Sequence, residues 1–82
     1  LFGHTYQVLC MQYDRTHHRL ITGSDDWTIK IWCARTGWLL HTLRGHVGEV
    51  QILALNREST MIASGATDGT IRIWCLRTGK PV

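Results

Sequence analysis

Three residue types that compose catalytic triads occur twice in this chain at the same spacing. A histidine, a hydroxyl residue and an aspartate recur with an offset of 42 residues, as the sets His4, Thr22, Asp26 and His46, Ser64, Asp68. Side chains of these types can activate a hydroxyl group as a nucleophile. However, no Gly-x-Ser-x-Gly elbow is present to expose a nucleophile, and the first set carries threonine in place of serine. A structural role is therefore favoured over catalysis, and the chain is not expected to be an enzyme.

The other residues capable of chemistry do not predict a metal site. The cysteines are odd in number and form no C-x-x-C pair: Cys10, Cys33 and Cys75. His17 and His18 are adjacent, so on a strand or hairpin they point to opposite sides, and no cysteine is spaced to complete a site with His41. We expect free thiols, no metal and no cofactor. Free thiols favour a reducing intracellular compartment, either nuclear or cytoplasmic.

The elements that position these residues are themselves repeated. Residues 20–32, LITGSDDWTIKIW, recur in altered form as residues 62–74, IASGATDGTIRIW, and 15 of the 40 positions that can be compared at the 42-residue offset are identical. A period of about 40 to 45 residues with a Gly-His start and an aromatic strand end is typical of propeller blades. The sequence therefore predicts two tandem blades, residues 1–42 and 43–82, with the second shortened in its fourth strand.

Alternating apolar residues and turn signals place short strands in each repeat. We expect strands at residues 8–13, 19–23, 28–33 and 38–43, then near 49–55, 60–65 and 70–75, with a stub at 80–82. In the first strand, residues 8, 10 and 12 would face one side and residues 9, 11 and 13 the other. Because both faces are apolar, each blade should be covered on both faces by neighbours. Two blades cannot close a ring, so the chain is predicted to be part of a larger propeller of seven or eight blades, with a self-assembling blade pair as the alternative.

At these positions the chain resembles two WD repeats. The resemblance implies an all-β fold of four-stranded antiparallel blades and a structural tetrad in each, filled here by His4, Thr22, Asp26 and Trp32 and by His46, Ser64, Asp68 and Trp74. A hydrogen-bonded chain from indole to hydroxyl to imidazole to carboxylate would satisfy four buried polar groups at once. The family's aspartate after the tryptophan is replaced by Cys33 and Cys75. That position lies outside the tetrad, so the expected fold is unaffected.

A narrower resemblance involves the turn Asp14-Arg15-Thr16 and the segment WCLRT at residues 74–78. These segments are most similar to the bromodomain and WD-repeat proteins, a chromatin-associated family. This resemblance implies WD repeats like those of substrate receptors in cullin-type ubiquitin ligases. Trp27 and Trp38 depart from the pattern expected of that family.

Composition agrees with a protein-binding role. The net charge is +3, which does not by itself indicate nucleic acid binding, and no apolar stretch approaches the ~20 residues of a membrane span. We therefore expect a soluble, non-catalytic interaction scaffold whose partners are other proteins and neighbouring blades, in the same chain or in further copies of it. Nucleic acid is the weaker alternative partner, and no membrane contact is expected.

The predicted turns fall on two rims of the blades. The basic rim carries Arg15, Arg35, Arg57 and Arg77, for which a solvated edge is favoured over a surface for acidic proteins or nucleic acid. The opposite rim, here named the Trp27 rim, carries the candidate protein-binding residues Tyr6, Gln7, Asp25, Trp27, Glu49 and Thr67. Trp27 takes the place of Gly69 in the other repeat, which indicates a turn with a positive φ angle. Trp27 is either a partner anchor or a contact between blades, and the sequence leaves the two open.

Overall fold

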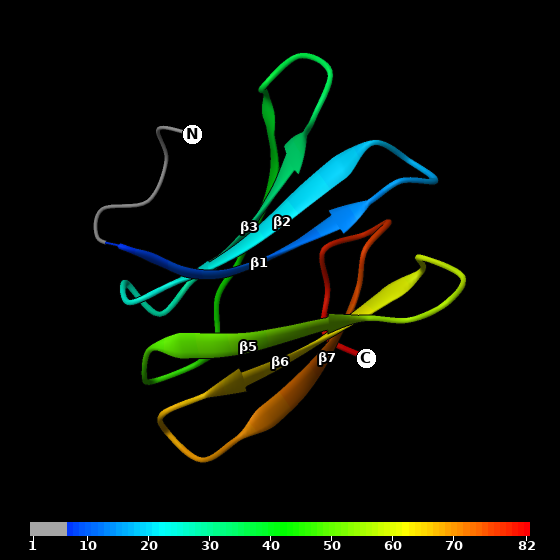
Figure 1. Cartoon of the computed structure of the whole chain (residues 1–82). Helices are drawn as coiled ribbons and strands as arrows, with labels where there is room; N and C mark the ends of the chain where they lie inside the picture. Colours follow the sequence, from blue (N-terminus) through cyan, green and yellow to red (C-terminus); the bar gives the residue numbers. More distant parts are fainter. Residues whose placement is uncertain (1–6) are drawn as a thin grey trace.

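The computed structural model describes residues 7–82, which form two antiparallel sheets (Figure 1). Blade 1 contains β1 (Val8–Asp14), β2 (Arg19–Ser24), β3 (Ile29–Cys33) and β4 (Leu39–Leu43), in that spatial order. Blade 2 contains β5 (Val50–Leu55), β6 (Met61–Ala66) and β7 (Ile71–Cys75). Its fourth strand is reduced to one bridge between Trp74 and Pro81. The predicted all-β pair of antiparallel blades is confirmed.

Strand ends differ from the prediction by one residue at several places. The strands β3 to β7 begin one residue later than expected, while β1, β2 and β6 end one residue later. At β3 and β7 the reason is local. Asp26 and Asp68 each accept a hydrogen bond, at 2.9 Å, from the backbone N–H two residues on, at Thr28 and Thr70. This bond holds each threonine in the turn and delays the strand.

The two blades are joined by an apolar interface in which β5 lies against β1 and β2 (Figure 1). The buried cluster spans both sheets and comprises Ile21, Ile29, Ile31, Leu43, Val50, Leu53, Ile62, Trp74 and Leu76. At the centre of this cluster the two sheets approach closely: a Cβ atom added to Gly23 would lie 2.6 Å from Val50 Cγ1 and 2.7 Å from Cys10 Sγ. Glycine is therefore required at position 23 for the blades to dock.

A β-bulge recurs at the start of each blade and changes one predicted side-chain direction. The register shifts between Val8 and Cys10 in blade 1 and between Val50 and Ile52 in blade 2, which are equivalent places. Val50 is buried against Gly23 of blade 1, while Ile52 is exposed on the opposite face. By the same geometry Val8 faces away from blade 2 and does not share the face of Cys10. The simple alternation expected for this strand was wrong at Val8 because the bulge adds one residue.

Candidate functional site

A buried hydrogen-bonded chain links the four tetrad residues of blade 2. The Trp74 indole Nε1 donates to Ser64 Oγ at 2.8 Å, and Ser64 Oγ lies 2.7 Å from His46 Nε2. His46 Nδ1 lies 3.5 Å from Asp68 Oδ2. Because a carboxylate only accepts, the proton belongs on Nδ1, so Nε2 accepts from the Ser64 hydroxyl. Each middle member of the chain therefore both donates and accepts.

Thr70 is a further member of this network, and the sequence reasoning missed it. Its hydroxyl donates to Asp68 Oδ1 at 2.6 Å, and its Oγ1 lies 3.1 Å from His46 Nδ1. Thr28 makes the same 2.6 Å contact with Asp26 in blade 1. The signal was present in the sequence, since both repeats carry Asp-x-Thr at matching positions.

These contacts hold Asp68 ionised. The Thr70 hydroxyl lowers the pKa of Asp68 far below its usual range, with further contributions from the backbone N–H groups of Val47 and Thr70 and from His46. Val47 N donates to Asp68 Oδ2 at 2.9 Å, which ties the loop before β5 to the β6–β7 turn. Although the Ser, His and Asp types match a catalytic triad, Ser64 is 1% exposed and its oxygen is held by Trp74. The hydrogen bonds therefore connect the loop before β5 to β6 and β7, and the buried Ser64 hydroxyl is not accessible to a substrate.

Blade 1 contains the corresponding strand contacts. Trp32 Nε1 donates to Thr22 Oγ1 at 3.0 Å, and both residues are buried. Asp26 is held in its turn by the Thr28 backbone and hydroxyl. The predicted fourth member, His4, lies outside the described residues.

On the Trp27 rim, each turn between the second and third strands of a blade is bonded to the segment that leads into its first strand. Asp25 N donates to the carbonyl of Gln7 at 3.1 Å, and Thr67 N donates to the carbonyl of Glu49 at 2.9 Å. Trp27 has a φ angle of 74° and is 49% exposed. Gly69, at the equivalent place, has a φ angle of 84°. Tyr6, the other predicted member of this rim, lies outside the described residues.

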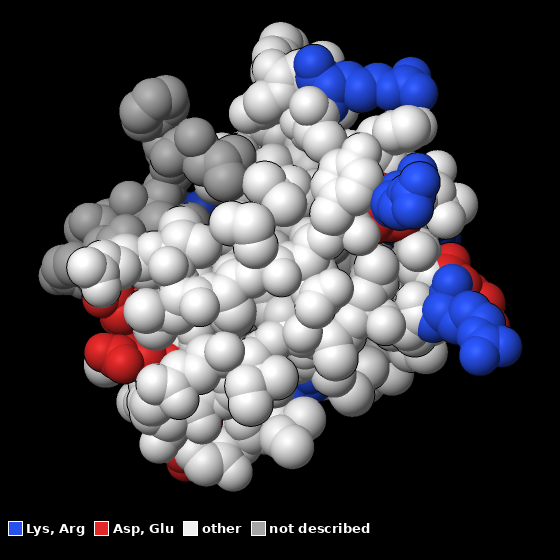
Figure 2. All heavy atoms as spheres, viewed as in Figure 1, with Lys and Arg blue, Asp and Glu red and all other residues white. Residues whose placement is uncertain are grey.

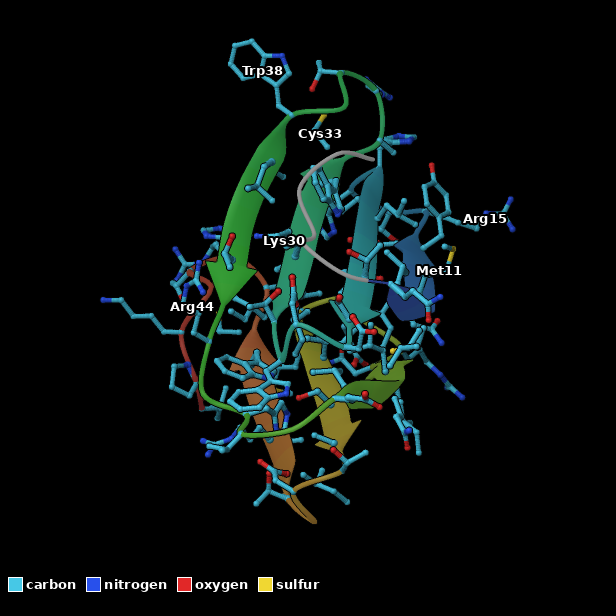
Figure 3. The ribbon with its side chains drawn as sticks, turned by 90° about the vertical axis from the view of Figure 1, so that its left-hand side faces the viewer. Met11, Arg15, Lys30, Cys33, Trp38 and Arg44 are labelled. Carbon is cyan, nitrogen blue, oxygen red and sulfur yellow. The ribbon has the colours of Figure 1, made fainter. Side chains whose placement is uncertain are left out.

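The turns that carry the four rim arginines lie at the other edge of the sheets. Arg15, Arg35, Arg57 and Arg77 are all exposed. Figure 2 shows basic side chains along the side where the β1–β2 and β5–β6 turns lie, with acidic side chains gathered on the opposite side and a few beside the basic ones. Trp38 is at the basic edge as well, 75% exposed and close to Cys33 at the end of blade 1 (Figure 3).

A buried ion pair joins the two blades near this rim, and it was not predicted. Asp14 is fully buried and accepts from Arg19 Nε at 3.0 Å and from Nη2 at 2.8 Å. Arg19 also donates to the carbonyls of Ser59 and Leu76 in blade 2, at 3.0 and 3.4 Å. Burial raises the pKa of Asp14, but hydrogen bonds from Arg19, Ser59 and His17 outweigh it and lower the pKa to about 2. Comparison of the repeats conceals this pair, because Asn56 and Met61 occupy the equivalent places.

The three cysteines are free thiols that lie on β1, β3 and β7. Burial raises the pKa of the Cys10 thiol. Cys33 and Cys75 lie at equivalent places, and a threonine hydroxyl lowers the pKa of each: Thr36 for Cys33 and Thr78 for Cys75. In residues 7–82 no group of three or more potential metal ligands is found, and no helix is long and apolar enough to span a membrane.

Comparisons with known proteins agree with this geometry. Residues 1–33 and 37–75 match the family model described as WD domain, G-beta repeat. A bromodomain and WD repeat-containing protein of Dictyostelium discoideum is 40% identical over 45 residues, which cover 55% of this chain and 2% of that protein. The crystal structure of the computationally designed Ika4 protein matches 99% of this chain and 48% of its own length, with a TM-score of 0.88 and 33% identity. The chain thus spans a small fraction of the first relative and about half of the designed protein, and it belongs to the WD40 repeat family.

Proposed function

We propose that this chain is a non-catalytic scaffold that binds other proteins through the Trp27 rim. WD repeats imply a protein-interaction role. The observation that carries the location is Trp27 itself, an indole about half exposed at a turn with a positive φ angle. A non-glycine residue in that conformation is strained, and strained positions are concentrated at binding and active sites. An exposed tryptophan on a rigid turn is also a common interface anchor.

The rest of the rim supports recognition without chemistry. Backbone bonds fix Asp25 to Gln7 and Thr67 to Glu49, so the turns present their side chains on a rigid base. Glu49 N also donates to Thr67 Oγ1 at 2.9 Å. By resemblance to the bromodomain and WD repeat-containing protein, the proposed setting is an intracellular, chromatin-associated or ubiquitin-ligase receptor protein, in the nucleus or cytoplasm.

Capture experiments with Trp27→Ala test the proposal. Equal amounts of immobilised wild-type and variant chain are exposed to nuclear extract, and the captured proteins are quantified by mass spectrometry. Trp38→Ala is the matched control, because it removes an even more exposed indole from the opposite rim. Loss of the same captured proteins with Trp27→Ala but not with Trp38→Ala supports the proposed face. Equal loss with both, or a loss that only follows a lowered melting temperature, refutes it.

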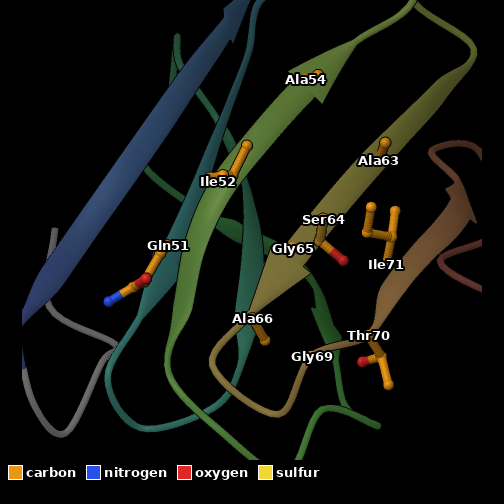
Figure 4. A pocket seen from close by; sticks show the side chains of 10 residues that line it. All are labelled: Gln51, Ile52, Ala54, Ala63, Ser64, Gly65, Ala66, Gly69, Thr70 and Ile71. Atoms are coloured by element: carbon orange, nitrogen blue, oxygen red, sulfur yellow. The ribbon is translucent and has the colours of Figure 1, made fainter.

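A second candidate function is self-assembly, and the exposed sheet faces favour it. Blade 2 presents an open apolar face, with a hollow of about 400 Å³, at Ile52, Ala54, Ala63, Gly65 and Ile71 (Figure 4). These are the repeat equivalents of the blade 1 residues that pack on blade 2. Conversely, Val8 and Met11 on the outer face of blade 1 are exposed, while their equivalents Val50 and Leu53 are buried. The open face of blade 2 therefore corresponds to the face of blade 1 that packs on blade 2, and the open face of blade 1 corresponds to the face of blade 2 that packs on blade 1. This correspondence favours head-to-tail stacking of copies.

Sedimentation equilibrium decides whether copies stack. A discrete closed oligomer that dissociates with Ile52→Asp or Ile71→Asp supports self-assembly, because a carboxylate on that face opposes docking. Val47→Asp is the control, since Val47 is exposed in the loop before β5 and lies off the sheet face. A wild-type chain that remains a monomer as its concentration is raised contradicts self-assembly and leaves the scaffold proposal in place.

A further inference from the structure

A pocket with polar and charged residues in its lining lies at the junction of the two blades on the basic rim. It encloses about 250 Å³ and is lined by His17, Arg19, Ser59, Thr60, Cys75 and Arg77. The first two residues belong to blade 1 and the other four to blade 2, so the pocket exists only where the blades meet. We name it the seam pocket. It is separate from the Trp27 rim, which is formed by the turns at the other edge of each sheet.

The floor of the seam pocket is electrically neutral. Arg19 pairs with the buried carboxylate of Asp14, and its guanidinium also donates to the carbonyls of Ser59 and Leu76. Asp14 in turn accepts from the backbone N–H groups of Thr16 and His17. Because both charges of this pair are fully compensated, Asp14 does not repel an anion and Arg19 does not supply the attraction.

The uncompensated positive charge comes from Arg77. This side chain is exposed, and in the described part of the chain it makes no ion pair. His17 Nδ1 lies 3.0 Å from Asp14 Oδ2 and 3.1 Å from Arg19 Nη2. With Nδ1 accepting from Arg19, the Nε2–H group remains to donate to a ligand. Thr60 Oγ1 accepts from Asn56 Nδ2 at 2.8 Å, which leaves its hydroxyl proton to donate. No carboxylate lines the pocket among the described residues.

A guanidinium, an imidazole and a hydroxyl around one small hollow form a set suited to oxyanions. We propose that the seam pocket binds a single anionic group, a phosphate or a carboxylate, carried by a partner peptide. The inference rests on the proposed scaffold function and adds a second contact of defined chemistry. Blade docking is a condition for binding, since neither blade supplies the set alone.

Cys75 provides a reporter inside the pocket, and Cys33 provides a matched control. In each turn a threonine hydroxyl, backbone N–H groups and the charge of one arginine, Arg77 or Arg35, act on the thiol. The local turns are thus equivalent, but only Cys75 also faces His17 and Arg19 across the seam. If copies were stacked head to tail, the residues facing Cys33 would be Ser59 and Met61, which are uncharged at these positions of the repeat. Cys33 therefore reports the turn without the pocket.

The test compares iodoacetate with iodoacetamide, two alkylating reagents of similar size that differ in charge. The full chain is treated with each reagent, and modification of Cys75 and Cys33 is followed by peptide mass spectrometry. Because each thiol lies beside one arginine, we expect similar ratios of iodoacetate to iodoacetamide rates at Cys75 and Cys33 when phosphate is absent. Inorganic phosphate at millimolar concentration should slow the iodoacetamide reaction at Cys75 and leave Cys33 unchanged.

Variants connect the effect to the pocket. Arg77→Gln should reduce the ratio at Cys75 and abolish protection by phosphate, whereas Arg35→Gln should reduce the ratio only at Cys33. No protection of Cys75 by phosphate, or equal protection of Cys33, overturns the proposal. Peptides with one phosphoserine or one glutamate then identify the source: stronger protection by the first assigns phosphate, and equal or stronger protection by the second assigns a carboxylate.

The outcome is distinguishable from failure of the proposed function. Phosphate protection of Cys75 together with unchanged capture by Trp27→Ala supports the seam pocket and refutes the Trp27 rim. Loss of capture with Trp27→Ala and an unprotected Cys75 supports the rim and refutes the pocket.

Discussion

Replacing His46 with alanine should destabilise the chain by roughly 2 kcal/mol. The substitution deletes the 2.7 Å bond to Ser64 and the contacts of Nδ1 with Thr70 and Asp68. It leaves a buried hydroxyl without its acceptor, which costs about 1 to 3 kcal/mol. Part of this loss is recoverable, because the Ser64 hydroxyl can turn toward the carbonyl of Arg72, 3.5 Å away. The middle of that range is therefore the expected value.

Urea denaturation followed by tryptophan fluorescence measures this change. Trp74 is a direct probe, since its ring centroid lies 6.4 Å from that of His46. For a domain of this size, about 2 kcal/mol corresponds to a melting temperature roughly 8 to 16 °C lower. His41→Ala is the control, because His41 is partly exposed and outside the tetrad. It should cost less than about 1 kcal/mol.

A double-mutant cycle with Ser64→Ala tests the physical reason. If the imidazole stabilises the fold through the serine hydroxyl, the double variant should lose about 1 kcal/mol less than the sum of the two single variants. Additive losses would contradict the hydrogen-bonded chain. A loss no larger than that of His41→Ala would also refute the reasoning, because it would mean that His46 is not needed to satisfy buried groups.

Three further predictions concern other parts of the chain. Because the folded pKa of Asp14 is about 2, below its unfolded value, the carboxylate stabilises the fold above about pH 4, and this contribution is lost as the pH falls from about 4 toward 2. Asp14→Asn should cost about 2 kcal/mol at pH 7 and should weaken the fall of the urea midpoint at acidic pH. An unchanged fall of the urea midpoint at acidic pH would contradict the ion pair. Trp27→Gly should raise stability by up to about 1 kcal/mol, since the turn already has a φ angle of 74°, and thermal melts showing a decrease would indicate that the indole packs against the fold. Cys33 and Cys75 should remain reduced in the folded chain, and a disulfide between them in a non-reducing peptide map would contradict their placement on β3 and β7.

The sequence predicted the architecture because the 42-residue offset is a strong constraint. Matching Gly-His, Asp and Trp positions located both blades and most strands to within one residue, since hydrophobic alternation and turn residues agree in the two copies. The positive φ angle of Trp27 was also predictable, because its partner in the repeat is Gly69. The strand positions and the turn at Trp27 could both be predicted because each occurs in two copies of the same repeat.

What the sequence did not predict depends on contacts between blades or on local irregularities. The bulge near Val8 reverses a side chain that simple alternation places on the wrong face. The Asp14–Arg19 pair reaches Ser59 and Leu76 across the seam, about 40 to 57 residues away in sequence. The equivalent residues of blade 2, Asn56 and Met61, are uncharged, so the repeat pattern does not indicate this ion pair. Thr70 was missed for a different reason: both repeats carry Asp-x-Thr, but threonine is ordinary at the predicted start of a strand, so its 2.6 Å bond to Asp68 was not expected.

The places where the repeats differ also bear on where function lies. The tetrad positions carry matching residue types in the two repeats, and in blade 2 they join the loop before β5 to β6 and β7. At the basic rim, Asp14, His17 and Arg19 in blade 1 correspond to Asn56, Ser59 and Met61 in blade 2. A purely structural seam could use the same residues in every blade. The ion pair and the cationic pocket therefore belong to the one junction between these two blades, and copying Asn, Ser and Met into positions 14, 17 and 19 should preserve the fold type while removing phosphate protection of Cys75. Retained protection in that triple variant would show that the blade 2 residues bind the anion alone and that blade 1 contributes nothing to the site.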